Sequence, residues 1–216
     1  MEIFITLMEI IGTIAFAISG AMVAVKKNMD ILGIVILGIT TAVGGGAIRD
    51  IILGNTPPQT FKNPTYPLIA FITSLIVFLF LYVYKKRIGH ENLKKWYEKL
   101  LIVFDAIGLG IFTTVGISVA MQTNETSNWF LCLFVGVITG VGGGVLRDVL
   151  ADDTPYILVK HIYACASIAG AIICIGLWNI AGKTISMIIG TVVVIIIRLL
   201  AAHYKWNLPK IKQNIE

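Results

Sequence analysis

The stretch TAVGGGAIRDIILGNTPP at residues 41–58 is repeated as TGVGGGVLRDVLADDTP at residues 139–155. In both copies three consecutive glycines are followed by an Arg-Asp pair and then by a proline, and the copies lie 98 positions apart. A second match precedes the first: EIIGTIAFAISGAMVA at 9–24 aligns with DAIGLGIFTTVGISVA at 105–120, at an offset of 96. Two matches in the same order indicate that one unit of the chain is duplicated.

The composition predicts that both copies lie in a membrane. Of the 216 residues 57% are hydrophobic and 13% are charged, and the mean hydropathy is +0.88. Soluble domains carry about 25% charged residues, and a soluble chain of this length has too little interior for so much apolar surface. The net charge of +5 comes without aromatic residues interleaved among basic ones. We therefore expect basic loops that orient membrane helices, and no nucleic-acid partner.

Seven apolar runs are long enough to cross a bilayer, which requires about 20 residues in a helix. The chain is therefore predicted to be an all-α membrane protein with a single transmembrane domain over 1–216. Asp30 and Asn128 stand where helix N-caps belong, and Pro57 and Pro155 stand where the second and fifth helices must end. The predicted spans are Ile3–Val25, Ile31–Leu53, Tyr66–Tyr84, Leu100–Met121, Trp129–Ala151, Tyr156–Trp178 and Thr184–Tyr204.

The number of spans in each copy decides how the copies are related. Repeat one (3–84) and repeat two (100–178) each cross the membrane three times, so the second copy enters from the opposite side. The two repeats are therefore predicted to be inverted, about a pseudo-two-fold axis in the membrane plane. The seventh helix (184–204) lies outside the repeat. Lysines and arginines concentrate in the first, third and fifth loops and the C-terminal segment, which predicts an outside N-terminus and a cytoplasmic C-terminus.

The glycine triplets allow two interpretations. Each glycine inside a helix costs about 1 kcal/mol relative to alanine, so two triplets need a reason. Close packing of helices is one reason, although it usually spaces glycines four apart. The other is a kink or unwound turn that lines a pathway, which the contiguous triplets favour. The pore or hinge candidates are the two triplets with the threonine one turn before each: Thr41, Gly44, Gly45, Gly46, Thr139, Gly142, Gly143 and Gly144.

Six charged residues fall within or at the edge of spans, where they are functional candidates by default: Glu9, Arg49, Asp50, Asp105, Arg147 and Asp148. Neighbours in a helix do not face each other, so we expect each arginine to find a partner outside its own Arg-Asp pair.

The inverted topology proposes those partners. It places Glu9 and Arg49 toward the outer face, and Asp105 and Arg147 toward the cytoplasmic face. Two charge layers are predicted, either as mouths of a pathway or as ion pairs that only hold helices together. Arg198 is expected to snorkel to the headgroups, and the Asp152–Asp153 pair is expected in a solvated loop.

The remaining reactive residues indicate neither a cofactor nor an enzyme. Three scattered cysteines lie in apolar stretches and are predicted to be buried: Cys132, Cys165 and Cys174. The three histidines show no ligand spacing, so no metal site is expected. Ser-His-Asp ordering, HExxH and a glycine-rich loop followed by Lys-Ser or Lys-Thr are all absent from the sequence.

The sequence resembles the bacterial and archaeal branch of the trimeric intracellular cation (TRIC) channels. The resemblance rests on GGGAIRD at 44–50, GGGVLRD at 142–148 and RLLAAHYKWNLP at 198–209, and covers nearly the whole chain. It implies a homotrimer in a prokaryotic inner membrane, surrounded by lipid. Each subunit would hold its own pore for potassium or sodium, lined by the second and fifth helices. Related bacterial sequences are also described as glycine transporters. The Lys-Glu-Val motif of the animal members is absent, so their phosphoinositide dependence is not expected.

A transporter therefore remains the alternative to the channel. Inverted repeats with broken helices are characteristic of secondary transporters, so the architecture alone favours a carrier of a small solute such as glycine. The resemblance favours a passive cation channel. Arginines beside a pore favour anions, and a cation pathway therefore needs them neutralised by carboxylates.

Overall fold

The computed structural model describes residues 2–85, 90–123, 128–159 and 162–206, and in these ranges every regular element is a helix. Six of the helices are long and apolar enough to cross a membrane. In chain order the elements are α1 (Glu2–Lys26), α2 (Ile31–Ile52), α3 (Gln59–Lys62), α4 (Thr65–Lys85), α5 (His90–Thr123), α6 (Trp129–Leu150), α7 (Tyr156–Val159), α8 (Tyr163–Leu177) and α9 (Lys183–His203). The all-helical membrane fold is thus confirmed.

Two predicted boundaries differ from the structure. The expected sixth span, Tyr156–Trp178, is divided into α7 and the 15-residue α8. Asp148 fixes where α7 begins, because its Oδ2 accepts a hydrogen bond from the Tyr156 backbone N–H at 2.8 Å. The fourth span was expected to begin at Leu100, but α5 begins at His90, because the polar residues before the span continue the helix. The N-caps were predicted correctly: Asp30 and Asn128 accept from Gly33 N and Leu131 N.

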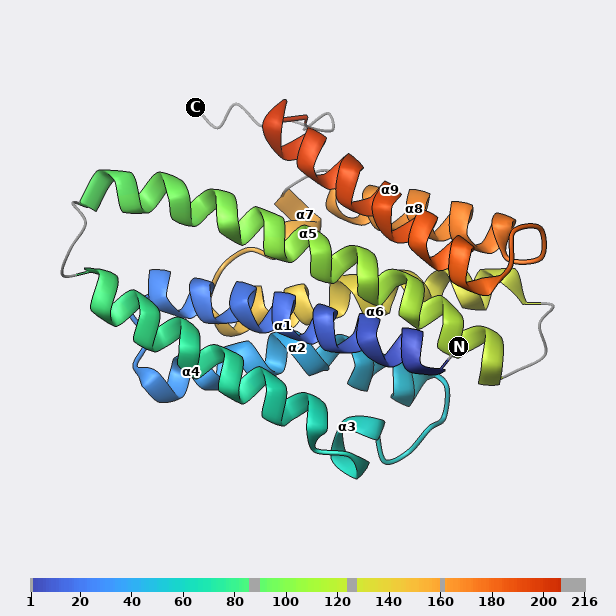
Figure 1. The fold of residues 1–216 in the computed structure, drawn as a ribbon, viewed down its shortest axis with the longest axis horizontal. Helices are drawn as coiled ribbons and strands as arrows, with labels where there is room; N and C mark the ends of the chain where they lie inside the picture. The colour runs from blue at the N-terminus through green and yellow to red at the C-terminus, as the bar shows by residue number, and fades with distance from the viewer. Residues whose placement is uncertain (1, 86–89, 124–127, 160–161, 207–216) are drawn as a thin grey trace, which may run out of the picture.

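The two ends of the bundle can be named by the segments they hold. The end with the start of α1, α3 and the start of α9 is called the N-face here, and the end with α7 and the last turn of α9 is called the C-face (Figure 1). On the C-face, Lys27 Nζ lies 2.6 Å from Asp153 Oδ1, so the first and fifth loops meet as the topology predicts. Asp153 is therefore paired rather than simply solvated.

The inverted repeat places α1 and α5 side by side through the middle of the bundle (Figure 1). At their contact Phe16 and Phe112, which answer each other in the alignment, stack with ring centroids 5.3 Å apart. Phe16 also lies against Gly108, and Phe112 against Gly12, so each ring covers a glycine of the other repeat. This reciprocal contact is the signature of a pseudo-two-fold axis.

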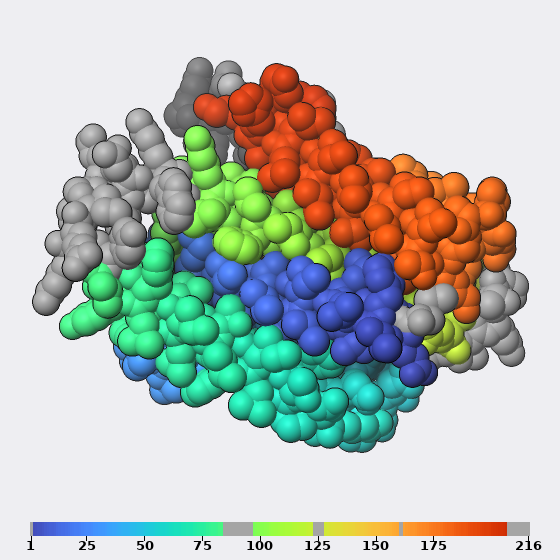
Figure 2. All heavy atoms as spheres, viewed as in Figure 1, coloured from blue at the N-terminus to red at the C-terminus, as the bar shows by residue number. Residues whose placement is uncertain are grey.

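The other helices surround this centre, and their exposed side chains are mostly apolar. α4 lies on one side of α1, while α9 lies on the opposite side, beyond α5 (Figure 2). Only 11% of the α4 span is buried against 72% of the α5 span, as expected for an outer helix that faces lipid. Cys132 and Cys174 are buried as predicted, whereas Cys165 is exposed on α8, so its predicted burial is wrong.

Hydrogen bonds between buried hydroxyls join α5 to α8 and to α9. Thr113 pairs with Ser167 of α8 at 2.7 Å, and Thr114 pairs with Thr191 of α9 at 2.8 Å. Such interhelical hydrogen bonds contribute on the order of 1 kcal/mol in membranes. The bond between Thr114 and Thr191 docks α9, which has no counterpart in the repeat, against α5.

The crossing of α2 and α6 is the closest contact between the repeats. A Cβ built on Gly45 would fall far inside 3.0 Å of the Thr139 carbonyl oxygen, and one on Gly143 would meet the Thr41 carbonyl in the same way. Backbone atoms cannot move aside as a flexible side chain can. Glycine is therefore required at both positions by the crossing itself.

We expect Gly45→Ala and Gly143→Ala each to lower the free energy of unfolding by about 1–3 kcal/mol, the usual cost of overpacking. The measurement is thermal unfolding of the purified chain in detergent. The matched control is Gly46→Ala in the same triplet, because its added methyl would meet only Arg49 Nη2 at 3.8 Å. Equal destabilisation by all three substitutions would contradict the crossing contact.

Candidate functional site

A buried charge cluster closes the C-face half of the bundle. Arg147 Nη1 lies 2.7 Å from Asp105 Oδ1, and its Nε lies 2.8 Å from Asp148 Oδ1. The same Nη1 donates to Ser19 Oγ at 2.5 Å, which ties α6 to α1 of the other repeat. The side chains of Arg147 and Asp105 are fully buried. The predicted inner pair of Asp105 and Arg147 is thus confirmed, within what is called the Arg147 cluster below.

Two further residues complete this cluster. Tyr163 donates its hydroxyl to Asp105 Oδ1 at 3.4 Å. The Arg198 guanidinium carbon lies 4.9 Å from the centre of the Tyr163 ring, and its Nη2 lies 3.9 Å from Asp105 Oδ2. Arg198 is only 3% exposed, so the predicted snorkelling is wrong. The Asp105 carboxylate and the Tyr163 ring both attract the Arg198 cation inside the bundle. Arg198 reaches them because α9 packs on α5.

Each arginine also pairs with the aspartate that follows it, contrary to prediction. Arg49 Nε lies 2.9 Å from Asp50 Oδ1, and Arg147 makes the equivalent contact with Asp148. The long arginine side chain folds back because a short helix fixes each aspartate. Asp50 Oδ2 accepts from the Gln59 N–H at the start of α3, as Asp148 does from the start of α7, both at 2.8 Å. These contacts make the Arg-Asp motif a link between helices within each repeat.

The N-face half has the same parts in a different arrangement. Tyr66 donates its hydroxyl to Glu9 Oε2 at 2.5 Å, as Tyr163 does to Asp105. Within the residues that the structure describes, no ion pair joins Glu9 to Arg49, so the predicted outer pair is wrong. Tyr66 holds the carboxylate and Asp50 holds the guanidinium. Glu9 and Arg49 instead line one cavity of about 440 Å³.

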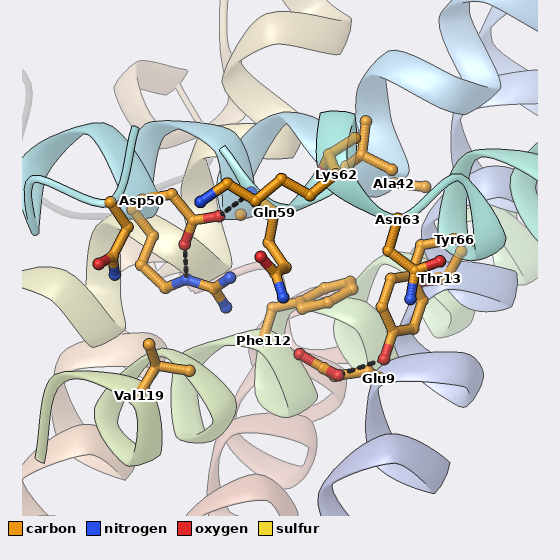
Figure 3. A pocket seen from close by; sticks show the side chains of 15 residues that line it. Glu9, Thr13, Ala42, Asp50, Gln59, Lys62, Asn63, Tyr66, Phe112 and Val119 are labelled. Carbon is orange, nitrogen blue, oxygen red and sulfur yellow. Dashed lines mark hydrogen bonds and ion pairs between the residues drawn. The ribbon is translucent and has the colours of Figure 1, made fainter. Parts of the chain in front are cut away.

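This cavity, called the vestibule here, combines polar groups of both signs (Figure 3). Glu9 and Asp50 contribute carboxylates, while Arg49 and Lys62 contribute cations. Its other polar lining residues are Thr13, Asn55, Gln59, Thr60, Asn63 and Tyr66. Because Asn55, Lys62 and Asn63 are exposed at the rim, the vestibule opens on the N-face.

The vestibule ends in the middle of the bundle. Ala42, Gly46 and Phe112 line its deeper part, and Phe112 stacks on Phe16. Ser19 lies one helical turn beyond Phe16 and carries the hydrogen bond from Arg147. An accessible N-face half thus leads toward a sealed C-face half.

Each residue of the glycine triplets has its own neighbour. The first ones, Gly44 and Gly142, face Leu146 and Ile48 of the opposite helix, and the second ones form the backbone crossing. The third ones face the charged groups: Gly46 lines the vestibule, and Gly144 lies against the Tyr163 hydroxyl.

The helices run unbroken through both triplets. The predicted unwound turn is therefore wrong, and close packing explains five of the six glycines, because only Gly46 has room for a methyl group. Thr41 and Thr139 do bond backbone groups, since each hydroxyl donates to the carbonyl four residues earlier at 2.6 Å.

Sequence reasoning missed several side chains of the site, among them Ser19, two tyrosines and Arg198. Tyr66 and Tyr163 stand 97 positions apart at the starts of α4 and α8, so an alignment of the third helices would have found them. Arg198 belongs to the helix outside the repeat and has no partner in any alignment of the halves. For a metal, no group of three or more acidic, cysteine or histidine side chains converges within the described residues.

Known proteins are similar to this chain over most of its length. The family model described as "Glycine transporter" matches residues 6–82 and 102–179, which are the two repeats. The inner membrane protein YadS of Escherichia coli K12 is 40% identical over 205 residues, covering 94% of this chain and 93% of the relative. The membrane protein YvgT of Bacillus subtilis 168 is 37% identical over 204 residues, or 94% of each chain.

Solved structures match equally well. A structure described under conductance through TRIC cation channels is 38% identical, with a TM-score of 0.82 over 98% of both chains. A prokaryotic TRIC channel crystallised in 0.5 M KCl gives a TM-score of 0.84 at 33% identity, over 96% of this chain and all of that one.

This chain belongs to the TRIC channel family. The Rhodobacter sphaeroides orthologue of that family gives a TM-score of 0.82 at 31% identity, over 94% of this chain and 98% of that one. Membership makes the chain a multi-pass membrane protein and not an enzyme. In this chain the Arg147 cluster and the vestibule contain the corresponding arginines of the two repeats, so Arg147 and Arg49 can be compared by matched substitutions.

We expect Arg147→Gln to lower the free energy of unfolding by about 3–5 kcal/mol, because it leaves buried Asp148 without a cation and buried Asp105 with only the longer contact to Arg198 at 3.9 Å. Arg49→Gln removes the equivalent residue of the other repeat, but beside a cavity that admits water. Its cost is expected to be smaller, about 1–3 kcal/mol, because Arg49, although also buried with a side chain 10% exposed, pairs with one carboxylate instead of two. The measurement is chemical or thermal unfolding in detergent, and similar losses for both variants would contradict the asymmetry.

Proposed function

We propose that the chain is a monovalent cation channel for potassium and sodium, working as a homotrimer with a pathway inside each subunit. The similarity to structures described as TRIC cation channels supports this assignment. The structural observation that most supports this proposal is the vestibule. It extends from the N-face toward the α2–α6 crossing, and the Arg147 cluster lies beyond that crossing. The pathway then runs between the two triplet-bearing helices.

The charge distribution of the vestibule is compatible with cations. Isolated arginines would repel them, but the Arg49 guanidinium is held by Asp50 at 2.9 Å. Among the described residues Glu9 has only the neutral Tyr66 hydroxyl as a side-chain partner. The Glu9 carboxylate therefore has no paired cation, whereas the Arg49 guanidinium is paired with Asp50.

The Arg147 cluster is the proposed gate. It joins α1, α5 and α6 by side-chain contacts at 2.5–2.8 Å and leaves no exposed side chain among its acidic and basic partners. Conduction requires Arg147 to release Ser19 and Asp105. The cost of that release, an unpaired buried charge, makes the closed gate the resting arrangement.

The Lys/Arg distribution supports an N-face on the outside and a C-face in the cytoplasm, by the positive-inside rule. With relatives named as inner membrane proteins, we place the chain in the inner membrane of a prokaryote.

A second candidate is a transporter of a small zwitterion such as glycine. The specific observation is that the vestibule offers carboxylates and cations together, which matches an ammonium and a carboxylate on one solute. The inverted repeats are also in unlike states, one accessible and one sealed, as alternating access requires. The family description "Glycine transporter" agrees with this candidate.

Recording from the purified chain in a planar bilayer under a potassium chloride gradient separates the two candidates. A channel gives discrete unitary currents that reverse toward the potassium equilibrium potential. A transporter gives exchange of labelled glycine in proteoliposomes without unitary currents. The second result would replace the channel assignment.

We expect Glu9→Gln to reduce unitary potassium conductance by up to about fivefold, since a unit charge ~4 Å away contributes ~1 kcal/mol in water. The control is Glu2→Gln, which removes the same charge from an exposed position in the first turn of the same helix. Both are measured as single-channel current at fixed voltage. Unchanged conductance in Glu9→Gln would place the ion pathway elsewhere.

A further inference from the structure

A second cavity lies on the C-face, next to the Arg147 cluster, and shares Arg198 with it. It has a volume of about 280 Å³ and lies where the last turns of α9 approach α5 and the start of α8. This cavity is called the α9 pocket here. Its lining residues are Ile102, Ile162, Arg198, Ala201, Ala202, Lys205 and Trp206.

Arg198 is the group in this pocket that lacks adequate partners. Its side chain is 3% exposed, yet neither Nε nor Nη2 makes a hydrogen bond. Its nearest carboxylate oxygen, Asp105 Oδ2, is 3.9 Å from Nη2, which is beyond hydrogen-bond distance. Buried guanidinium groups are normally satisfied on their donors. Asp105 Oδ2 also lacks a hydrogen-bond partner but lies beyond bonding distance of Nη2, and Nε has no acceptor, so the unused donors of Arg198 leave room for a further acceptor in the pocket.

The local charge balance allows that acceptor to be an anion. In the Arg147 cluster the two arginines are balanced by Asp105 and Asp148, and Arg147 has the short contacts to both. Arg198 therefore interacts more weakly with the carboxylates than Arg147 does, at 3.9 Å from Asp105 Oδ2. Lys205, exposed just after α9, adds a positive charge at the mouth of the pocket. The pocket is thus lined by two cations, and no acidic residue is among its lining residues.

The shape of the donors selects the class of anion. A guanidinium presents parallel N–H groups that match two oxygens of a phosphate, and an ammonium adds a point charge. The other walls are apolar, with Trp206 half-exposed at the end of the helix, where tryptophan sits at the headgroup level. Basic pockets between membrane helices bind phosphate headgroups of lipids.

We propose that the α9 pocket binds a phosphate group, held by Arg198 and Lys205, and that its apolar walls select an anionic lipid as the carrier of that phosphate. The proposal does not depend on whether the pathway conducts ions or carries a solute. It predicts a site formed by the seventh helix, with no counterpart on the N-face, because α9 lies outside the repeat.

The test is lipid binding to the purified full-length chain in detergent, followed by native mass spectrometry. We expect phosphatidylglycerol to bind more tightly than the zwitterionic phosphatidylcholine. Lys205→Gln should weaken phosphatidylglycerol binding about fivefold, the effect of one basic residue at an anionic surface. The matched control is Lys99→Gln, which removes the same charge from an exposed position on α5 outside the pocket.

Each outcome decides between alternatives. Displacement of phosphatidylglycerol by inorganic phosphate would assign the site to free phosphate, and resistance to displacement would assign it to the lipid. Equal binding of both lipids, or equal affinity of the Lys205→Gln and Lys99→Gln variants, would overturn the proposal. Arg198→Lys keeps the charge but loses the paired donors, so it should also weaken binding, and Lys205→Gln remains informative if this buried variant does not fold.

Discussion

The contact on which the structure depends is the approach of two backbones where α2 crosses α6. Gly45 lies against the Thr139 carbonyl and Gly143 against the Thr41 carbonyl. The same crossing fixes where each helix carries its arginine, one turn farther on and toward opposite faces. A side chain at either glycine would separate the helices, and Arg147 would then lose its reach to Ser19 on α1 and Asp105 on α5. Packing and electrostatics are therefore parts of one arrangement.

Burying the Arg147 cluster does not by itself make the protein more stable. Removing two ion pairs from water costs several kcal/mol per ion, which good geometry only repays. What the cluster provides is a unique alignment of α1, α5 and α6, because each acceptor comes from a different helix or turn. The homologous residues on the N-face satisfy the same groups with local partners, Tyr66 and Asp50. The same residue types thus form an ion pair between helices on the C-face, Asp105 with Arg147, and remain apart on the N-face, Glu9 and Arg49.

The sequence was sufficient for the topology because the inversion follows from counting. Three spans per repeat and one matched motif fix the opposite orientations, and the depth of Asp105 and Arg147 then follows. The depth of Glu9 and Arg49 was equally predictable, but depth does not determine pairing. Tyr66 and Asp50 compete for the two groups, and that competition depends on where α3 and α4 begin. Helix continuity through the triplets was also undecidable, because glycine permits both a close crossing and a break.

The burial of Arg198 was missed for a different reason. Snorkelling was judged from its position along one helix, whereas its actual place depends on α9 docking on α5 through Thr191 and Thr114. Docking between helices that no repeat relates leaves no pattern in a single sequence. The same limit applies to Cys165, whose apolar surroundings in sequence are the lipid-facing side of α8.

The seventh helix also removes the energetic equivalence of the two halves. In a perfectly duplicated protein, exchanging the states of the two repeats would cost no net free energy. The two states would then be equally populated, and each face would be closed half of the time. Arg198 adds a cation to the C-face half alone, next to a carboxylate and an aromatic ring. A differential interaction of about 1.4 kcal/mol is enough to shift such an equilibrium tenfold. Appending one helix to a symmetric pair therefore turns a balanced molecule into one with a preferred direction across the membrane.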